Sequence, residues 1–142
     1  VLGSAAFIRQ ARRTRKILGG GMRQAGVLAA AGHYALQHHV RRLAEDHANL
    51  HTLASGLRAV GENHPVLRGR ITVHPWQTNI LFTDVQADVA PAFTAWLALH
   101  QIRVTSSLYG GQSRLRWVTH LDVNAADVQA ALDCVARFTL PG

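Results

Sequence analysis

The 142-residue sequence is short of several residue types, and each shortage excludes a class of protein. Its one cysteine, Cys134, has no second cysteine with which to form an internal disulfide. Apolar runs of about 18 residues, the length needed to cross a membrane, do not occur, and no signal-peptide pattern is present. These features predict a cytoplasmic protein that makes no membrane contact.

Acidic residues are also scarce, since 8 aspartates and glutamates stand against 15 lysines and arginines, and the formal net charge is +7. A positive chain favours an anionic partner, which can be a nucleic acid, a phosphorylated cofactor or a carboxylate substrate. With 48% hydrophobic residues the chain can form one ordinary core, because single domains typically hold about 100 to 150 residues.

The first part of the chain predicts helices. Residues 5–17 have helical spacing, and the glycines at 19–21 interrupt the helix, because glycine costs about 1 kcal/mol relative to alanine in a helix interior. Residues 24–60 predict one long amphipathic helix that ends at Gly61. Its apolar stripe consists of Leu36, Val40, Leu43, His47, Leu50, Leu53 and Leu57.

After Gly61 the apolar period shortens, and short strands alternate with helices. The expected strands cover residues 71–73, 79–85, 102–104 and 114–120. Two helices are expected among them, one capped by Asp88 and one capped by Asn124. This order predicts an α+β arrangement in which helices pack against a small antiparallel sheet.

The stretch GGGMRQAG, residues 19–26, has two interpretations. Bare backbone amides followed by a helix can bind an anion, and Lys16 and Arg23 would add positive charge. The stretch lacks the spacing of the established phosphate-binding loops, however, and a flexible break between two helices is the more common explanation of such a stretch. Spacing alone leaves both interpretations open.

Three other groups of residues have features of a functional site. His47 and His51 are four residues apart, but the ligand set for zinc is incomplete, so no metal site is predicted. Arg114 and Arg116 share one face of a strand, where they can bind a carboxylate or form an ordinary solvated face. The basic run at residues 9–16 suits nucleic acid, but no recognisable nucleic-acid-binding pattern frames it.

Four segments, in order, resemble one family. Residues 15–36 (RKILGGGMRQAGVLAAAGHYAL), 42–57 (RLAEDHANLHTLASGL), 77–82 (QTNILF) and 116–123 (RWVTHLDV) are similar to consecutive parts of the low-specificity L-threonine aldolases. The resemblance covers nearly the whole chain. It implies an α+β fragment of a pyridoxal-phosphate enzyme of fold type I, which cleaves L-threonine or L-allo-threonine to glycine and acetaldehyde.

The resemblance also implies roles for individual residues. Arg23 and Lys16 are expected to bind the cofactor phosphate of a neighbouring protomer, so that the protein would be a dimer or tetramer. Arg116 is expected to bind the α-carboxylate of a small amino-acid substrate, whereas Arg114 is expected to be an exposed surface charge. Lys16 matches the loop lysine, so the lysine that forms the Schiff base with the cofactor is expected upstream of Val1.

The chain is therefore expected to be the C-terminal portion of a longer enzyme and inactive without its N-terminal portion. Residues 1–23 would form the end of the large cofactor-binding domain, which includes the glycine-rich loop. Residues 24–60 would form a long helix that connects it to the small α+β domain, residues 61–142. The alternatives are another fold type I enzyme, either an aminotransferase or a β-eliminating lyase, or a basic nucleic-acid-binding domain.

Overall fold

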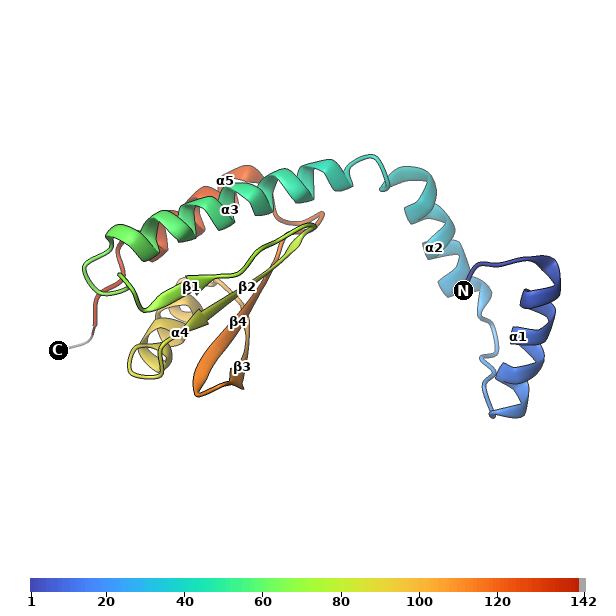
Figure 1. Cartoon of the computed structure of the whole chain (residues 1–142). Helices are drawn as coiled ribbons and strands as arrows, with labels where there is room; N and C mark the ends of the chain where they lie inside the picture. The colour runs from blue at the N-terminus through green and yellow to red at the C-terminus, as the bar shows by residue number, and fades with distance from the viewer. Residues whose placement is uncertain (141–142) are drawn as a thin grey trace. The chain divides into compact units, whose positions relative to one another are not determined.

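A computed structural model describes residues 1–140, and the chain divides into two units, residues 1–40 and the chain from Arg41 onward (Figure 1). The first unit holds α1 (Ala5–Ile17) and α2 (Gly26–His38), and neither helix has a buried residue. Ser4 caps α1, because its side chain accepts a hydrogen bond from the Phe7 amide at 3.2 Å. The helix predicted over residues 5–17 is thus confirmed.

The prediction of one helix over residues 24–60 is wrong. The structure has two helices there, because α2 ends at His38 and α3 spans Leu43–Asn63. The flanking residues His39 and Arg42 keep right-handed helical backbone angles, so the break needs no glycine or proline and leaves no such signal in the sequence. Gly61 lies inside α3, where a Cβ atom would come within 3.1 Å of the Ile71 side chain.

Asp46, rather than His47, lies on the buried side of α3. Asp46 is 2% exposed, and its carboxylate accepts two hydrogen bonds from Arg42 at 2.9 and 3.2 Å. His47 is exposed, so the predicted stripe is wrong at this position. The residues of the predicted stripe that precede His47 are exposed as well, namely Leu36, Val40 and Leu43. The residues that follow His47 are buried, namely Leu50, Leu53 and Leu57.

Four antiparallel strands form one sheet in the order β1-β2-β4-β3. They are β1 (Ile71–Val73), β2 (Ile80–Val85), β3 (Thr105–Tyr109) and β4 (Gln112–Val118). The predicted antiparallel sheet is confirmed, and so are the strands expected over residues 71–73 and 79–85. The strand expected over 114–120 is present but begins and ends two residues earlier.

The strand predicted over residues 102–104 is wrong, since β3 begins only at Thr105. A two-residue turn sets its position. Gly110 and Gly111, with φ angles of 57° and 78°, connect the paired residues Tyr109 and Gln112. Two positive φ angles are typical of the tight turn that joins antiparallel strands, so the turn decides which residues of β3 pair with β4.

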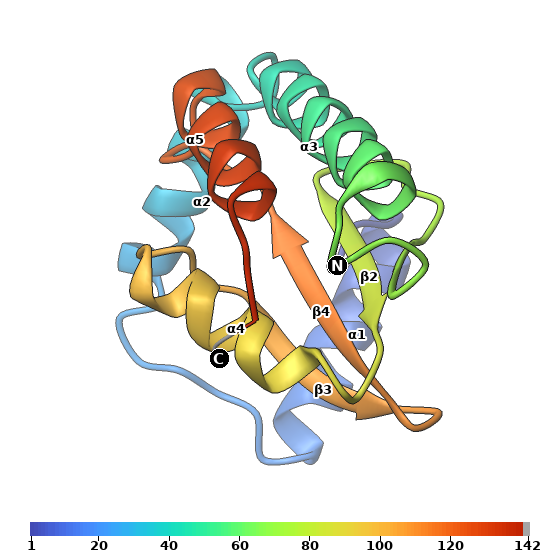
Figure 2. The same ribbon diagram turned by 90° about the vertical axis from the view of Figure 1, so that its left-hand side faces the viewer.

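Helices α3, α4 (Ala90–Leu99) and α5 (Ala125–Ala136) contribute to a single core with one face of the sheet. Helices α3 and α5 lie side by side in both views (Figures 1 and 2). The buried residues of this core include Leu50, Leu57, Leu81, Val85, Val89, Phe93, Leu97, Leu115, Trp117, Val128, Val135 and Phe138. All three helices therefore bury their apolar sides on the same face of the sheet.

One of the two predicted helix caps is correct. Asn124 accepts hydrogen bonds from the amides of Ala126 and Asp127, and Asp127 accepts one from the Asn124 amide, which makes a complete capping box for α5. Asp88 does not cap α4, whose N-cap is Val89 without a side-chain hydrogen bond. The Asp88 carboxylate instead lies 3.3 Å from Arg70.

Candidate functional site

Arg116 projects from the face of the sheet opposite the helical core. It lies on β4 between Leu115 and Trp117, which are 0% and 3% exposed, so the alternation of the strand directs Arg116 away from the core. Its neighbours across the sheet are Phe82 on β2 and Thr105 on β3, both exposed. Among residues 1–140, no hydrogen bond or ion pair engages the Arg116 side chain.

Arg114, two residues earlier on the same face, is paired with a carboxylate. Its Nε and Nη2 atoms donate to the two carboxylate oxygens of Asp84 at 2.7 and 2.8 Å. Its guanidinium also lies over the Tyr109 ring, with 4.0 Å between Cζ and the ring centroid. The expectation that Arg114 is an exposed surface charge is therefore wrong.

Asp84 receives a third hydrogen bond from the sheet edge. His74 Nε2 lies 2.8 Å from Oδ2 of Asp84, so His74 and Arg114 both direct N–H groups at this carboxylate when the histidine proton is on Nε2. The hydrogen bonds from Arg114 lower the pKa of Asp84 from 3.8 to about 2, with a smaller contribution from the His74 hydrogen bond and against the opposing effect of burial. The same pairing raises the pKa of Arg114. Asp84 thus remains a carboxylate at any ordinary pH.

The end of β4 is attached to the rest of the unit by Thr119 and Asn79. The Asn79 side chain donates to the Thr119 carbonyl at 2.8 Å, and the Thr119 amide donates to the Asn79 carbonyl at 3.1 Å. The buried Thr119 hydroxyl donates to the Asp46 carbonyl at 2.7 Å, which connects the strand to α3. These bonds hold the segment that follows Arg116 in one position.

The glycine-rich stretch lies in the first unit, after α1. The Gly20 amide donates to the Arg15 carbonyl at 2.7 Å and the Gly19 amide to that of Lys16 at 3.1 Å, the two bonds of a Schellman helix end. Gly19 has a φ of +80°, and a Cβ on Gly20 would lie 2.9 Å from the Arg15 carbonyl oxygen. Two of the three glycines are therefore required to end the helix.

Gly21, the third glycine, lies beside the only lysine. A Cβ atom on Gly21 would be 3.7 Å from Lys16 Nζ. Lys16 and Arg23 are both exposed and flank the glycines in sequence. Both belong to the first unit, whereas Arg116 belongs to the second.

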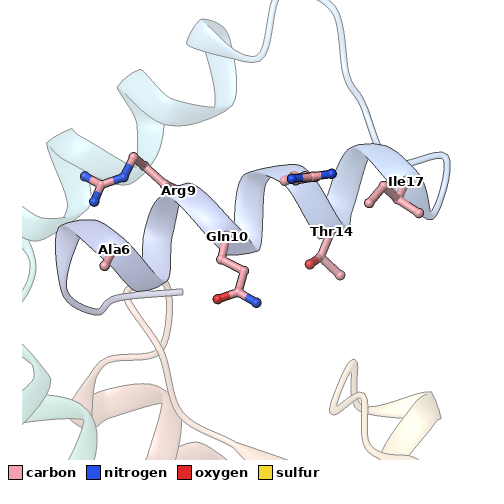
Figure 3. A pocket seen from close by; sticks show the side chains of 6 residues that line it. Ala6, Arg9, Gln10, Thr14 and Ile17 are labelled. Carbon is pink, nitrogen blue, oxygen red and sulfur yellow. The ribbon is translucent and has the colours of Figure 1, made fainter.

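A shallow hollow runs along α1 and is lined by Ala6, Arg9, Gln10, Arg13, Thr14 and Ile17 (Figure 3). All of these residues come from one helix, so the hollow is a side of that helix rather than a closed cavity. It contains none of the three predicted site residues. Among the helices of residues 1–140, none combines the length and the apolar character needed to span a membrane.

Several residues around Arg116 were not found by sequence reasoning. Asp84 lies on β2 and His74 directly follows β1, whereas Arg114 lies on β4, so their contact depends on a strand register that the sequence does not display. The sequence indicates the burial of Thr119 only weakly. Thr119 is polar, but it stands two residues after Trp117 and continues the buried alternation of Leu115 and Trp117. A buried hydroxyl requires a hydrogen-bond partner, and that requirement points to a structural role.

The chain is similar in sequence to a protein family and to several known proteins. The family model described as "Beta-eliminating lyase" matches residues 1–88. The chain is 38% identical over 140 residues to the "Probable low-specificity L-threonine aldolase 2" of Arabidopsis thaliana, which covers 97% of this chain and 37% of that protein. It is 40% identical over 124 residues to the "Low specificity L-threonine aldolase" of Escherichia coli K12, covering 87% of this chain and 33% of that protein.

Among solved structures, the 8-amino-7-oxononanoate synthase of Francisella tularensis matches with a TM-score of 0.58 and 17% identity, over 77% of this chain and 30% of that one. These findings confirm the resemblance and the fold class predicted from the sequence. The chain spans about a third of the length of the aldolases that it matches.

Proposed function

Since the chain belongs to the beta-eliminating lyase family, we propose that it is the C-terminal part of a pyridoxal-phosphate-dependent L-threonine aldolase. The complete protein would cleave L-threonine, L-allo-threonine and related β-hydroxy-α-amino acids to glycine and an aldehyde. The observation that carries this proposal is Arg116, an exposed guanidinium left unpaired within residues 1–140, in the segment RWVTHLDV.

Arg116 has the chemistry that a carboxylate ligand needs. A guanidinium is planar and presents parallel N–H groups, so it binds the two oxygens of a carboxylate at once and fixes the orientation of the substrate. Fixing the α-carboxylate also fixes the direction of the bond between Cα and Cβ, which is the bond that breaks. The hydrogen bonds of Asn79 and Thr119 keep the strand end beside Arg116 in place during binding.

The chain contains residues suited to bind the phosphate of pyridoxal phosphate. When bound, the cofactor supplies the electron-accepting ring that makes cleavage of the Cα–Cβ bond possible. Lys16 and Arg23 would hold its phosphate, because both are exposed cations beside backbone that carries no side chains. Lys16 is the only lysine of the chain, so the lysine that binds the cofactor aldehyde is proposed to lie in an N-terminal portion of the protein.

The assembly is proposed to be a homodimer or homotetramer, in which Lys16 and Arg23 serve the cofactor of a neighbouring protomer. Helices α1 and α2 bury no residue of their own, so they need a further surface to pack against, which the N-terminal portion of the protein or a neighbouring protomer would provide. We further propose that the protein acts in the cytoplasm, in threonine catabolism and glycine biosynthesis.

Activity of the full-length protein tests the proposal. The protein is supplied with pyridoxal phosphate and L-threonine or L-allo-threonine, and glycine and acetaldehyde are measured. Equal amounts of the two products are expected. A β-eliminating lyase would instead release ammonia and a keto acid, and an aminotransferase would produce a keto acid only when an amino acceptor is present. Either result without acetaldehyde would overturn the proposal.

A further inference from the structure

We propose that Asp84 masks Arg114 from substrate carboxylates and so makes this face of the sheet selective for substrates that carry one carboxylate. The inference deepens the proposed function and rests on the role of Arg116 given there. It assigns a specificity-determining role to Asp84, a residue that does not itself contact the substrate.

Two arginines on one strand face form a potential site for two carboxylates. Arg114 and Arg116 are separated by one residue, which places their Cα atoms about 7 Å apart on the same side of an extended strand. Each guanidinium can bind one carboxylate through a pair of parallel hydrogen bonds. A dicarboxylic acid with a short carbon chain would therefore bridge the two arginines if both were available.

Only Arg116 is available, because Asp84 occupies Arg114. The Asp84 carboxylate takes the Nε and Nη2 donors of Arg114, one of the two donor pairs through which a guanidinium binds a carboxylate, and it compensates the arginine's charge. Tyr109 covers one face of the same guanidinium. The charge of Arg114 is thus compensated, and two of its N–H groups are already bonded. Arg116, on the same strand, has no ion pair and no side-chain hydrogen bond within residues 1–140.

Asp84 is itself held firmly enough to remain in this position. Its side chain is 12% exposed, and His74 Nε2 lies 2.8 Å from the oxygen that Arg114 Nη2 also contacts. The pKa of Asp84, lowered to about 2, keeps it charged wherever the protein is folded at ordinary pH. A second carboxylate approaching Arg114 would have to displace a charged, hydrogen-bonded partner. A cross-strand ion pair with a purely structural role would affect stability without affecting selectivity, and this difference can be measured.

The test measures binding of succinate and propionate to the full-length protein by isothermal titration calorimetry at low ionic strength. In the wild-type chain the two acids should bind with similar affinity. Asp84→Ala should strengthen succinate binding at least tenfold relative to propionate, because Arg114 gains a carboxylate. Asp84→Asn removes the charge but keeps a hydrogen-bond acceptor, and it should shift the ratio of succinate to propionate affinity in the same direction. It provides the test if Asp84→Ala fails to fold.

The double variant Asp84→Ala/Arg114→Ala should return the ratio to the wild-type value. An unchanged ratio in folded Asp84→Ala or Asp84→Asn chains would overturn the inference. Adding Arg116→Ala to Asp84→Ala separates the inference from the proposed function. If the gain in succinate affinity disappears, the result supports both the masking of Arg114 by Asp84 and the role of Arg116 as a carboxylate ligand. If a gain that needs Arg114 persists without Arg116, Asp84 still masks Arg114, but the assignment of Arg116 in the proposed function is wrong.

Discussion

The indole Nε1 of Trp117 donates a hydrogen bond to the Thr83 hydroxyl at 3.0 Å inside the core, across the pair of strands β2 and β4. Both residues are buried, at 3% and 0% exposure. Because side chains alternate along a strand, this bond fixes which face of β4 points outward. Arg116, the residue before Trp117, is held on the open face as a consequence.

Thr83→Val should destabilise the chain by about 1 to 3 kcal/mol, since it leaves the buried indole N–H without an acceptor while keeping the shape of the side chain. The matched control is Thr72→Val on β1, where the threonine is exposed, and there the change should stay within about 0.5 kcal/mol. Urea unfolding followed by tryptophan fluorescence measures both. Equal losses in the two variants would show that the indole bond contributes nothing specific.

Asp84 should contribute to stability in a defined pH window. Its pKa is lowered from 3.8 to about 2 in the folded chain, so folding favours the charged form. The contribution is fully present above the unfolded pKa and is lost as the pH falls through about 4 to 2. Asp84→Asn should therefore be less stable than the wild type at pH 6, and the difference should shrink toward pH 2. Unfolding free energies from urea titrations across this range give the answer, and a gap that stays constant with pH would contradict the assignment.

Much of the second unit follows from local signals in the sequence. The capping box at Asn124 and the alternation of Leu115 and Trp117 were predictable, because each depends on residues within one turn or one strand. The strand Thr105–Tyr109 was not, since all five of its residues are exposed and no apolar alternation marks it. The Gly110–Gly111 turn was the available signal, because two adjacent glycines between short segments are typical of a hairpin.

The site was predictable only in part, for a related reason. The position of Arg116 followed from a family resemblance, whereas strand periodicity treated Arg114 and Arg116 alike. What distinguishes them is Asp84, 30 residues away in sequence and opposite Arg114 in the strand register. A register between strands depends on the whole sheet, so local patterns do not reveal which arginine is paired.

The glycine-rich stretch gives a separate prediction about the cofactor. In the full-length protein, Arg23→Ala should weaken the binding of pyridoxal phosphate on the order of tenfold or more, because it removes a charge-assisted contact to the phosphate. Arg12→Ala, an exposed arginine on α1, is the matched control and should leave the affinity unchanged. Equilibrium dialysis provides the two dissociation constants. Equal affinities in Arg23→Ala and wild type would leave the glycines with their role in ending α1 alone.

Steady-state cleavage of L-allo-threonine by the full-length protein and its Arg116→Ala variant shows whether Arg116 binds the substrate carboxylate. Cofactor absorbance and Arg137→Ala, an exposed arginine after α5, serve as controls. We expect a loss in kcat/KM on the order of a hundredfold or more for Arg116→Ala, poor rescue by Arg116→Lys, and normal turnover for Arg137→Ala. Near-normal cleavage by Arg116→Ala with the cofactor still bound would show that the substrate carboxylate binds elsewhere.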